Sequence, residues 1–143
     1  MKNVSFILFS LVILGCGSKK AKVLPFDTEI TSANAKEVTA FENTPESVVM
    51  YFYASLIRDD NDWQKVCPAE EKQTKMFRGK MGDEYSQWTF NKYRFVKKEE
   101  FQKDRYYVTI YMSISINGKE DDGEDQVTVE RIGDKWMVTD VPS

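Results

Sequence analysis

A strict alternation of side chains over residues 106–117 constrains the fold of this chain more than any other feature. Its alternate apolar positions are Tyr106, Val108, Ile110, Met112, Ile114 and Ile116. The positions between them carry mostly hydroxyl and amide groups, including Thr109, Ser113 and Asn117. Because successive side chains of a strand point to opposite faces, a period of two predicts a long strand with one buried face. The chain is therefore expected to form a sheet that packs this face against another layer.

Three further stretches around this strand predict a sheet of four strands. The four strands cover residues 93–101, residues 106–117, a stretch containing Val127 and Val129, and residues 135–141. Between them we expect a hairpin turn at residues 102–104, a loop over residues 118–123 and a turn at residues 133–134. Short connections join neighbouring antiparallel strands, so the sequence predicts an antiparallel meander.

Upstream of the sheet, apolar residues recur with the spacing of helices. Residues 44–46, Thr-Pro-Glu, supply an N-cap, a proline at the first helical position and an acid in the first turn. The apolar stripe that follows consists of Val48, Val49, Phe52, Tyr53, Leu56 and Ile57. The polar run 58–62 ends this helix, and Asp62 is expected to cap a short second helix that Pro68 stops. A third helix is predicted over residues 69–80.

Helices followed by strands predict an α+β domain with N-terminal helices packed on one face of a four-stranded antiparallel sheet. This order resembles the nuclear transport factor 2-like (cystatin-like) superfamily, especially its small bacterial lipoproteins of unknown function. The resemblance rests on the helix at residues 44–56, the aspartate-rich break at 59–63 and the segment 132–140, and it covers residues 44–141. It implies a curved sheet whose concave face, crossed by the first helix, forms a cone-shaped pocket.

The N-terminal residues predict export and a lipid anchor. Lys2 precedes an apolar run over residues 4–14, which is too short to span a bilayer but typical of a secretory signal. The run ends in Ile-Leu-Gly-Cys at residues 13–16, which resembles the lipobox of bacterial lipoproteins. The resemblance implies that residues 1–15 are removed and that Cys16 is lipidated. An ordinary secretory signal is the alternative.

This interpretation divides the chain into a signal peptide (1–15), a lipidated cysteine with a flexible tether (16–43) and an α+β domain (44–143). The tether is predicted from its polar composition. Two or more acyl chains hold a protein stably on a membrane without a spanning helix. Gly17 is not the aspartate associated with retention in the inner membrane of some bacteria, so we favour the outer membrane of the cell envelope.

Composition excludes several classes of function. Removal of the lysine in the signal lowers the formal net charge from −3 to −4, and no basic stripe is present, so no nucleic-acid partner is expected. The chain has no histidine, which removes the usual catalytic triads and the commonest transition-metal ligand. We expect no metal, no cofactor and no catalysis. With Cys16 lipidated, Cys67 is either a buried small hydrophobe or a partner in an intermolecular disulfide.

The concave face is the predicted binding site for a small apolar ligand. Its candidate residues are Phe52, Leu56, Trp63, Phe77, Phe95, Ile110, Met112 and Trp136. The same residues would also suit a packed core, because cores and pockets share one composition. No acid falls on an inward strand position in this interpretation. The acidic run 120–125 lacks the spacing of a calcium loop and is expected to be a solvated hairpin loop.

The outward face of the sheet supplies the alternative function. Tyr107, Tyr111 and Met137 are candidates for an exposed patch that docks a partner in the envelope, and a homodimer through this face is left open. Covering of the patch by residues 17–43 is the competing interpretation. The predicted function is therefore ligand binding without catalysis. Structural docking is the first alternative, and a histidine-free isomerase or hydratase is the second.

Overall fold

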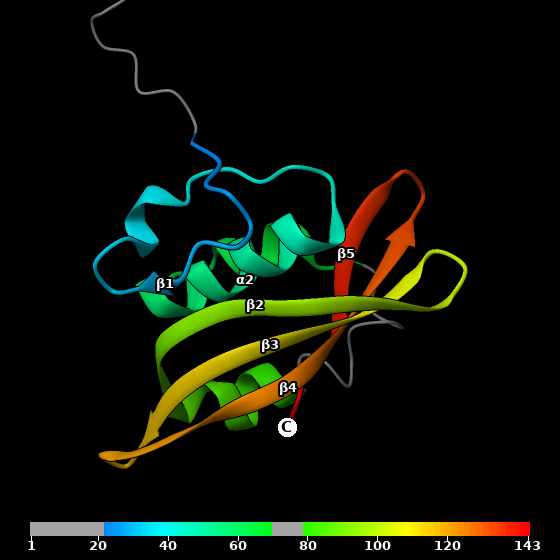
Figure 1. Cartoon of the computed structure of the whole chain (residues 1–143). Coiled ribbons are helices and arrows are strands. Elements are labelled where there is room, and N and C mark those ends of the chain that lie inside the picture. The colour runs from blue at the N-terminus through cyan, green and yellow to red at the C-terminus, as the bar shows by residue number, and fades with distance from the viewer. Residues whose placement is uncertain (1–21, 70–78) are drawn as a thin grey trace, which may run out of the picture.

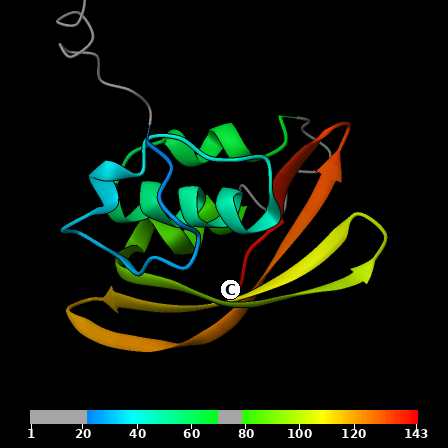
Figure 2. The same cartoon turned by 45° about the horizontal axis from the view of Figure 1, so that its top comes forward.

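The computed structural model describes residues 22–69 and 79–143, and it consists mainly of a curled antiparallel sheet (Figure 1). The strand order is β1-β2-β3-β4-β5. The strands are β1 (Ile30–Thr31), β2 (Trp88–Gln102), β3 (Arg105–Ile116), β4 (Lys119–Ile132) and β5 (Lys135–Asp140). The helix α2 (Pro45–Arg58) crosses the concave side of this curled sheet (Figure 2). The described residues include no helix long and apolar enough to cross a membrane.

The predicted fold class, N-terminal helices on a four-stranded sheet, is wrong. The sheet has five strands, because β1 enters it before the helix and pairs with β2 through Ile30 and Tyr93. The predicted second helix is a short 3-10 helix, η2 (Asp62–Val66), and the predicted third lies largely on residues 70–78, outside the described residues. A strand of two residues carries no periodicity, so β1 left no pattern in the sequence.

The long helix forms where its sequence signals predicted. The Thr44 side chain accepts a hydrogen bond from the Ser47 backbone N–H at 3.2 Å, and Pro45 occupies the first turn. The helix ends at Arg58 and is capped by Asp59, which has a left-handed conformation with φ 62°. Val48, Val49, Phe52 and Tyr53 of its apolar stripe are buried, whereas Leu56 and Ile57 are partly buried. The N-terminal boundary of this helix is therefore confirmed.

Residues 22–43, which were predicted to belong to a flexible tether, pack against the domain instead. Ile30, Ala35 and Val38 are buried in the core. The Arg58 guanidinium donates hydrogen bonds to the carbonyl oxygens of Ala35 at 2.9 Å and Val38 at 2.8 Å. A short 3-10 helix, η1 (Ala35–Glu37), lies at this junction. A few scattered apolar residues bury this segment. Because they follow no regular period and the segment is mostly polar, its composition predicted a tether.

β4 is longer than the sequence predicted. Residues 119–123 of the predicted loop belong to a continuous strand, and the actual turn consists of Asn117 and Gly118, with φ of 53° and 79°. Positive φ at both central residues defines the tight hairpin turn that Asn-Gly favours. The high acidity of the residues after it concealed the strand. The central alternation is confirmed, since Val108, Ile110, Met112 and Ile114 are all buried.

Candidate ligand-binding groove

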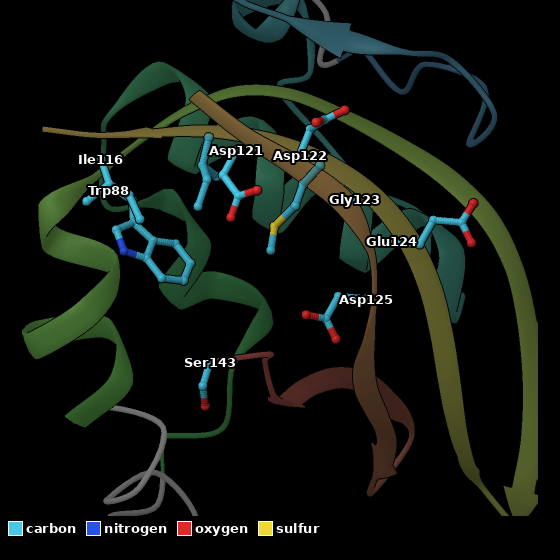
Figure 3. A pocket seen from close by; sticks show the side chains of 10 residues that line it. Trp88, Ile116, Asp121, Asp122, Gly123, Glu124, Asp125 and Ser143 are labelled. Atoms are coloured by element: carbon cyan, nitrogen blue, oxygen red, sulfur yellow. The ribbon is translucent and has the colours of Figure 1, made fainter. Parts of the chain in front are cut away.

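A groove lies on the concave side of the sheet, at the end formed by the β3–β4 hairpin (Figure 3). Its volume is about 270 Å³. It is lined by Trp88, Met112, Ile114, Ile116, Asp121, Asp122, Gly123, Glu124, Asp125 and Ser143. We call this site the Trp88 groove. It joins the first residue of β2 to the strand pair β3–β4, so the sheet itself fixes its shape.

The floor of the Trp88 groove is apolar. Met112 and Ile114 are the inward-facing residues of β3 here and are 8% and 6% exposed. The Trp88 ring packs against Tyr85, with ring centroids 4.8 Å apart, and against Phe90 at 6.0 Å. These contacts fix the position of the indole ring. The floor therefore offers preformed apolar surface.

Two carboxylates face this apolar floor. The register pairs Asp121 with Ile114, Gly123 with Met112, and Asp125 with Ile110, and cross-strand partners share a face of the sheet. Figure 3 shows the Asp121 and Asp125 side chains pointing into the groove, while Asp122 and Glu124 point away. The expectation that no acid occupies an inward strand position is therefore wrong.

The charge of this end of the groove is not neutralised by cations of the described chain. Within residues 22–69 and 79–143, neither Asp121 nor Asp125 takes part in an ion pair. Asp125 accepts a hydrogen bond from the Gln126 backbone N–H at 2.9 Å. On the opposite face, the Tyr111 hydroxyl donates to Asp122 at 2.6 Å, and this bond raises the pKa of Tyr111. The inward-facing pair thus forms a negative site next to apolar surface.

The predicted pocket residues do not converge on one cavity. Phe52 and Ile110 are fully buried in the core, and Phe95 packs edge-on against Phe26 with ring centroids 5.0 Å apart. Met112 lines the Trp88 groove, whereas Phe77 lies outside the described residues.

The other candidates line two further depressions. Leu56 and Trp63 border one of about 270 Å³ between the end of α2 and residues 81–90. Trp136 borders another depression of about 240 Å³, which Lys65 and Lys135 also line. Trp88, which pattern reasoning missed, borders both the first of these depressions and the Trp88 groove.

The three partner candidates lie on the convex face. Their cross-strand partners are Thr128 for Tyr107, Glu124 for Tyr111 and Glu130 for Met137. The Tyr107 ring stacks on Phe101 with centroids 4.0 Å apart, and Phe101 is 38% exposed. The Arg94 guanidinium lies 5.1 Å from the centroid of Tyr111.

Three tyrosines form a buried cluster beneath the sheet. The hydroxyls of Tyr53 and Tyr85 lie 3.3 Å apart, and Tyr85 donates to the carbonyl oxygen of Pro142 at 3.0 Å. The ring of Tyr53 stacks on Tyr93 with centroids 5.4 Å apart. Burial raises the pKa of all three phenols, and the negative charge of Asp125 adds to this effect at Tyr53 and Tyr85. The cluster is therefore uncharged at physiological pH.

Cys67 and the acidic run 120–125, the two remaining candidates, have the geometry of structural residues. Cys67 is 9% exposed, its thiol donates to the carbonyl oxygen of Trp63 at 3.3 Å, and burial raises its pKa. The acids of residues 120–125 alternate between the two faces of β4 and do not surround one point. In the described part of the chain, no group of three or more His, Cys, Asp or Glu residues is placed to hold a metal ion.

Comparison with known proteins adds a fold likeness. No family model and no curated protein matches the chain. The structure is similar to the solution structure of a SEC-C motif containing protein from Rhodopseudomonas palustris, with a TM-score of 0.53 and 16% sequence identity. The match covers 77% of this chain and 86% of that one. At this identity, the likeness extends to the fold alone.

Proposed function

We propose that this protein is a lipid-anchored binding protein of the bacterial envelope that does not transform its ligand. The ligand occupies the Trp88 groove and has an apolar body and a positively charged group. One observation carries this proposal: Asp121 and Asp125 point over an apolar floor and have no cation partner within the described residues. The sequence predicted a purely apolar ligand. The two negatively charged carboxylates favour a ligand that also carries a positively charged group.

Both parts of such a ligand would gain free energy in the groove. Each 100 Å² of apolar ligand surface removed from water contributes about 2.5 kcal/mol. A cation about 5 Å from a carboxylate at an effective dielectric constant of about 20 gains about 3 kcal/mol before the cost of desolvation.

Isothermal titration calorimetry with simple amphiphiles tests the groove. Residues 16–143 carrying Cys16→Ser would be titrated with n-octylammonium, n-octanol and octanoate. We expect n-octylammonium to bind at least about tenfold more tightly than the other two, because only it carries a positive charge that the carboxylates attract. The double variant Asp121→Asn/Asp125→Asn should lose this preference. Glu99→Gln/Glu100→Gln is the matched control, since these two acids lie near the other end of β2 and do not line the groove. Equal binding of all three amphiphiles would rule the proposal out.

The lipid anchor is tested separately, because Cys16 lies outside the described residues. Cells expressing the full chain would be fed an alkyne analogue of palmitate. We expect label on the wild-type protein and none on Cys16→Ser, together with release of the variant from the membrane fraction. Label that persists in Cys16→Ser would contradict the anchor.

Docking of an envelope protein on the convex face is a second candidate function. The stacked pair Phe101 and Tyr107 favours it, because exposed aromatic surface often marks an interaction site. Cross-linking in the native envelope, with and without Tyr107→Glu, would detect such a partner. A cross-linked product that is unchanged by this substitution would argue against this face.

A further inference from the structure

We infer that the ligand of the Trp88 groove is an extended basic segment of a partner protein, which adds to the free outer edge of β4 as a further strand. The inference rests on the proposed function and names the class of ligand. Its three supports are an unpaired strand edge, an uncompensated negative charge and an open groove beside the edge.

The outer edge of β4 is unpaired over its first part. β5 pairs with β4 only over residues 128–132, whereas residues 119–127 pair with β3 alone among the residues that the structure describes. Apart from the pairing with β3, no backbone hydrogen bond joins residues 119–127 to another element within the described chain. Half of the backbone groups of a strand that is paired on one side point to the open edge and are ready to pair with an added strand. Nine residues at about 3.4 Å each give an edge of about 30 Å.

The charge of this edge selects the partner. Its acids are Glu120, Asp121, Asp122, Glu124 and Asp125, against the single cation Lys119. Within residues 22–69 and 79–143, none of these acids forms an ion pair. A second copy of the same edge would place acid beside acid, which is unfavourable for cross-strand neighbours. A segment rich in lysine or arginine is therefore the complementary occupant.

The groove provides room for a side chain of the added strand. Gly123 occupies the inward-facing position opposite Met112, and a Cβ placed on it would have no atom within 4 Å. The groove is lined by the consecutive residues 121–125, so it reaches the strand edge as well as one face. A peptide along this edge would place alternate side chains toward Trp88 and the acids. Main-chain hydrogen bonds supply affinity in this mode of binding, and side-chain pockets supply specificity.

A designed peptide probe tests the inference. Fluorescein-labelled Lys-Leu-Lys-Val-Lys-Leu-Lys amide would be titrated into residues 16–143 carrying Cys16→Ser, with anisotropy as the readout. A second peptide of the same sequence would carry N-methyl groups on alternate amides, in either of the two phases. We expect one of these phases to weaken binding at least tenfold, because it removes the donors that face β4. Hydrogen exchange should slow at residues 119–127 when the unmethylated peptide is bound.

Each outcome separates the inference from the proposed function. Equal binding of the unmethylated peptide and both methylated forms would overturn strand addition, while n-octylammonium binding would leave the groove proposal intact. Failure of the unmethylated peptide to bind, with n-octylammonium still bound, would likewise overturn strand addition and leave the groove proposal intact. Loss of both ligands would overturn both proposals. An edge-to-edge dimer of this chain, seen by sedimentation and lost with Asp122→Lys, would replace the peptide as occupant.

Discussion

The two halves of β4 share one strand and one neighbour, β3, but they differ in chemistry. In the second half, Val127 and Val129 face inward and are fully buried, and β5 pairs with the outer edge over residues 128–132. In the first half, Asp121, Gly123 and Asp125 occupy the equivalent inward positions, and no strand of the described chain pairs with the outer edge. The buried half holds the strand in register, so the exposed half can present charged groups at fixed positions without contributing to the core.

The largest expected effect comes from exchanging the chemistry of the two halves. Val129→Asp would bury an unpaired charge, and we expect it to lower the free energy of unfolding by more than about 4 kcal/mol or to prevent folding. Asp121→Val, the reverse change in the exposed half, should alter it by less than about 0.5 kcal/mol. Urea denaturation measures both. Similar losses in the two variants would show that the halves do not differ as described.

A second change makes the exposed half resemble the buried half. Gly123→Val fills the inward-facing position of the groove with a β-branched side chain. We expect n-octylammonium binding to weaken at least about tenfold, by about 1.4 kcal/mol, because the side chain occupies the ligand's space. The free energy of unfolding should rise by about 0.5–1 kcal/mol, since glycine weakens strands. Calorimetric titration and urea denaturation give the two values, and undiminished binding would place the ligand elsewhere.

The turn that aligns the acids with the groove gives a smaller effect. Gly118 has φ 79°, a conformation that costs a residue with a Cβ about 1 kcal/mol. We expect Gly118→Ala to lower the free energy of unfolding by about that amount while preserving ligand binding. Gly123→Ala is the control, because Gly123 does not have a positive φ. Equal destabilisation by both alanines would contradict the assigned turn.

The smallest expected effect distinguishes a paired carboxylate from those in the groove. Burial opposes the charged form of Asp60, but hydrogen bonds from Arg58 and Ser55 outweigh it and lower its pKa. The resulting stability is present above the unfolded-state pKa of about 4 and is lost as the pH falls through the lower folded-state pKa.

We therefore expect Asp60→Asn to destabilise the protein at about pH 7 and to destabilise it less at about pH 2.5, below the unfolded-state pKa. The loss should stay below about 1 kcal/mol, because the Asp60 side chain is 38% exposed and solvent screens the ion pair. Asp121→Asn should not be destabilising at either pH, because Asp121 has no cation partner among the described residues. Urea denaturation at the two values of pH measures both variants. A larger loss for Asp121→Asn would reverse the comparison.

The sequence predicted those elements that carry a strong local signal. Thr44 and Pro45 identified the start of α2, and the alternation from Val108 onward identified the buried face of β3. Both signals depend on neighbouring residues only. Ile30, in contrast, is buried by residues far along the chain, so its two-residue strand was missed and the fold class was wrong.

The groove was missed for a related reason. Asn117 and Gly118 are a strong signal for a two-residue hairpin turn, but the acids after them were taken for a solvated loop. With the turn placed there, Ile116 pairs with Lys119, and counting back along the strands pairs Ile114 with Asp121. The inward position of the acids was thus predictable from the register. The contribution of Trp88 was not, because it depends on how the start of β2 packs against Tyr85.

Chemical-shift mapping of n-octylammonium binding by NMR tests the central claim most directly. The spectra would follow the backbone amides of β4 and the indole N–H of Trp88 in residues 16–143 carrying Cys16→Ser. We predict that shifts concentrate at Trp88 and residues 119–126, leave residues 127–132 unchanged, and disappear in Asp121→Asn/Asp125→Asn. Shifts concentrated at Phe101 and Tyr107 on the convex face would contradict the account.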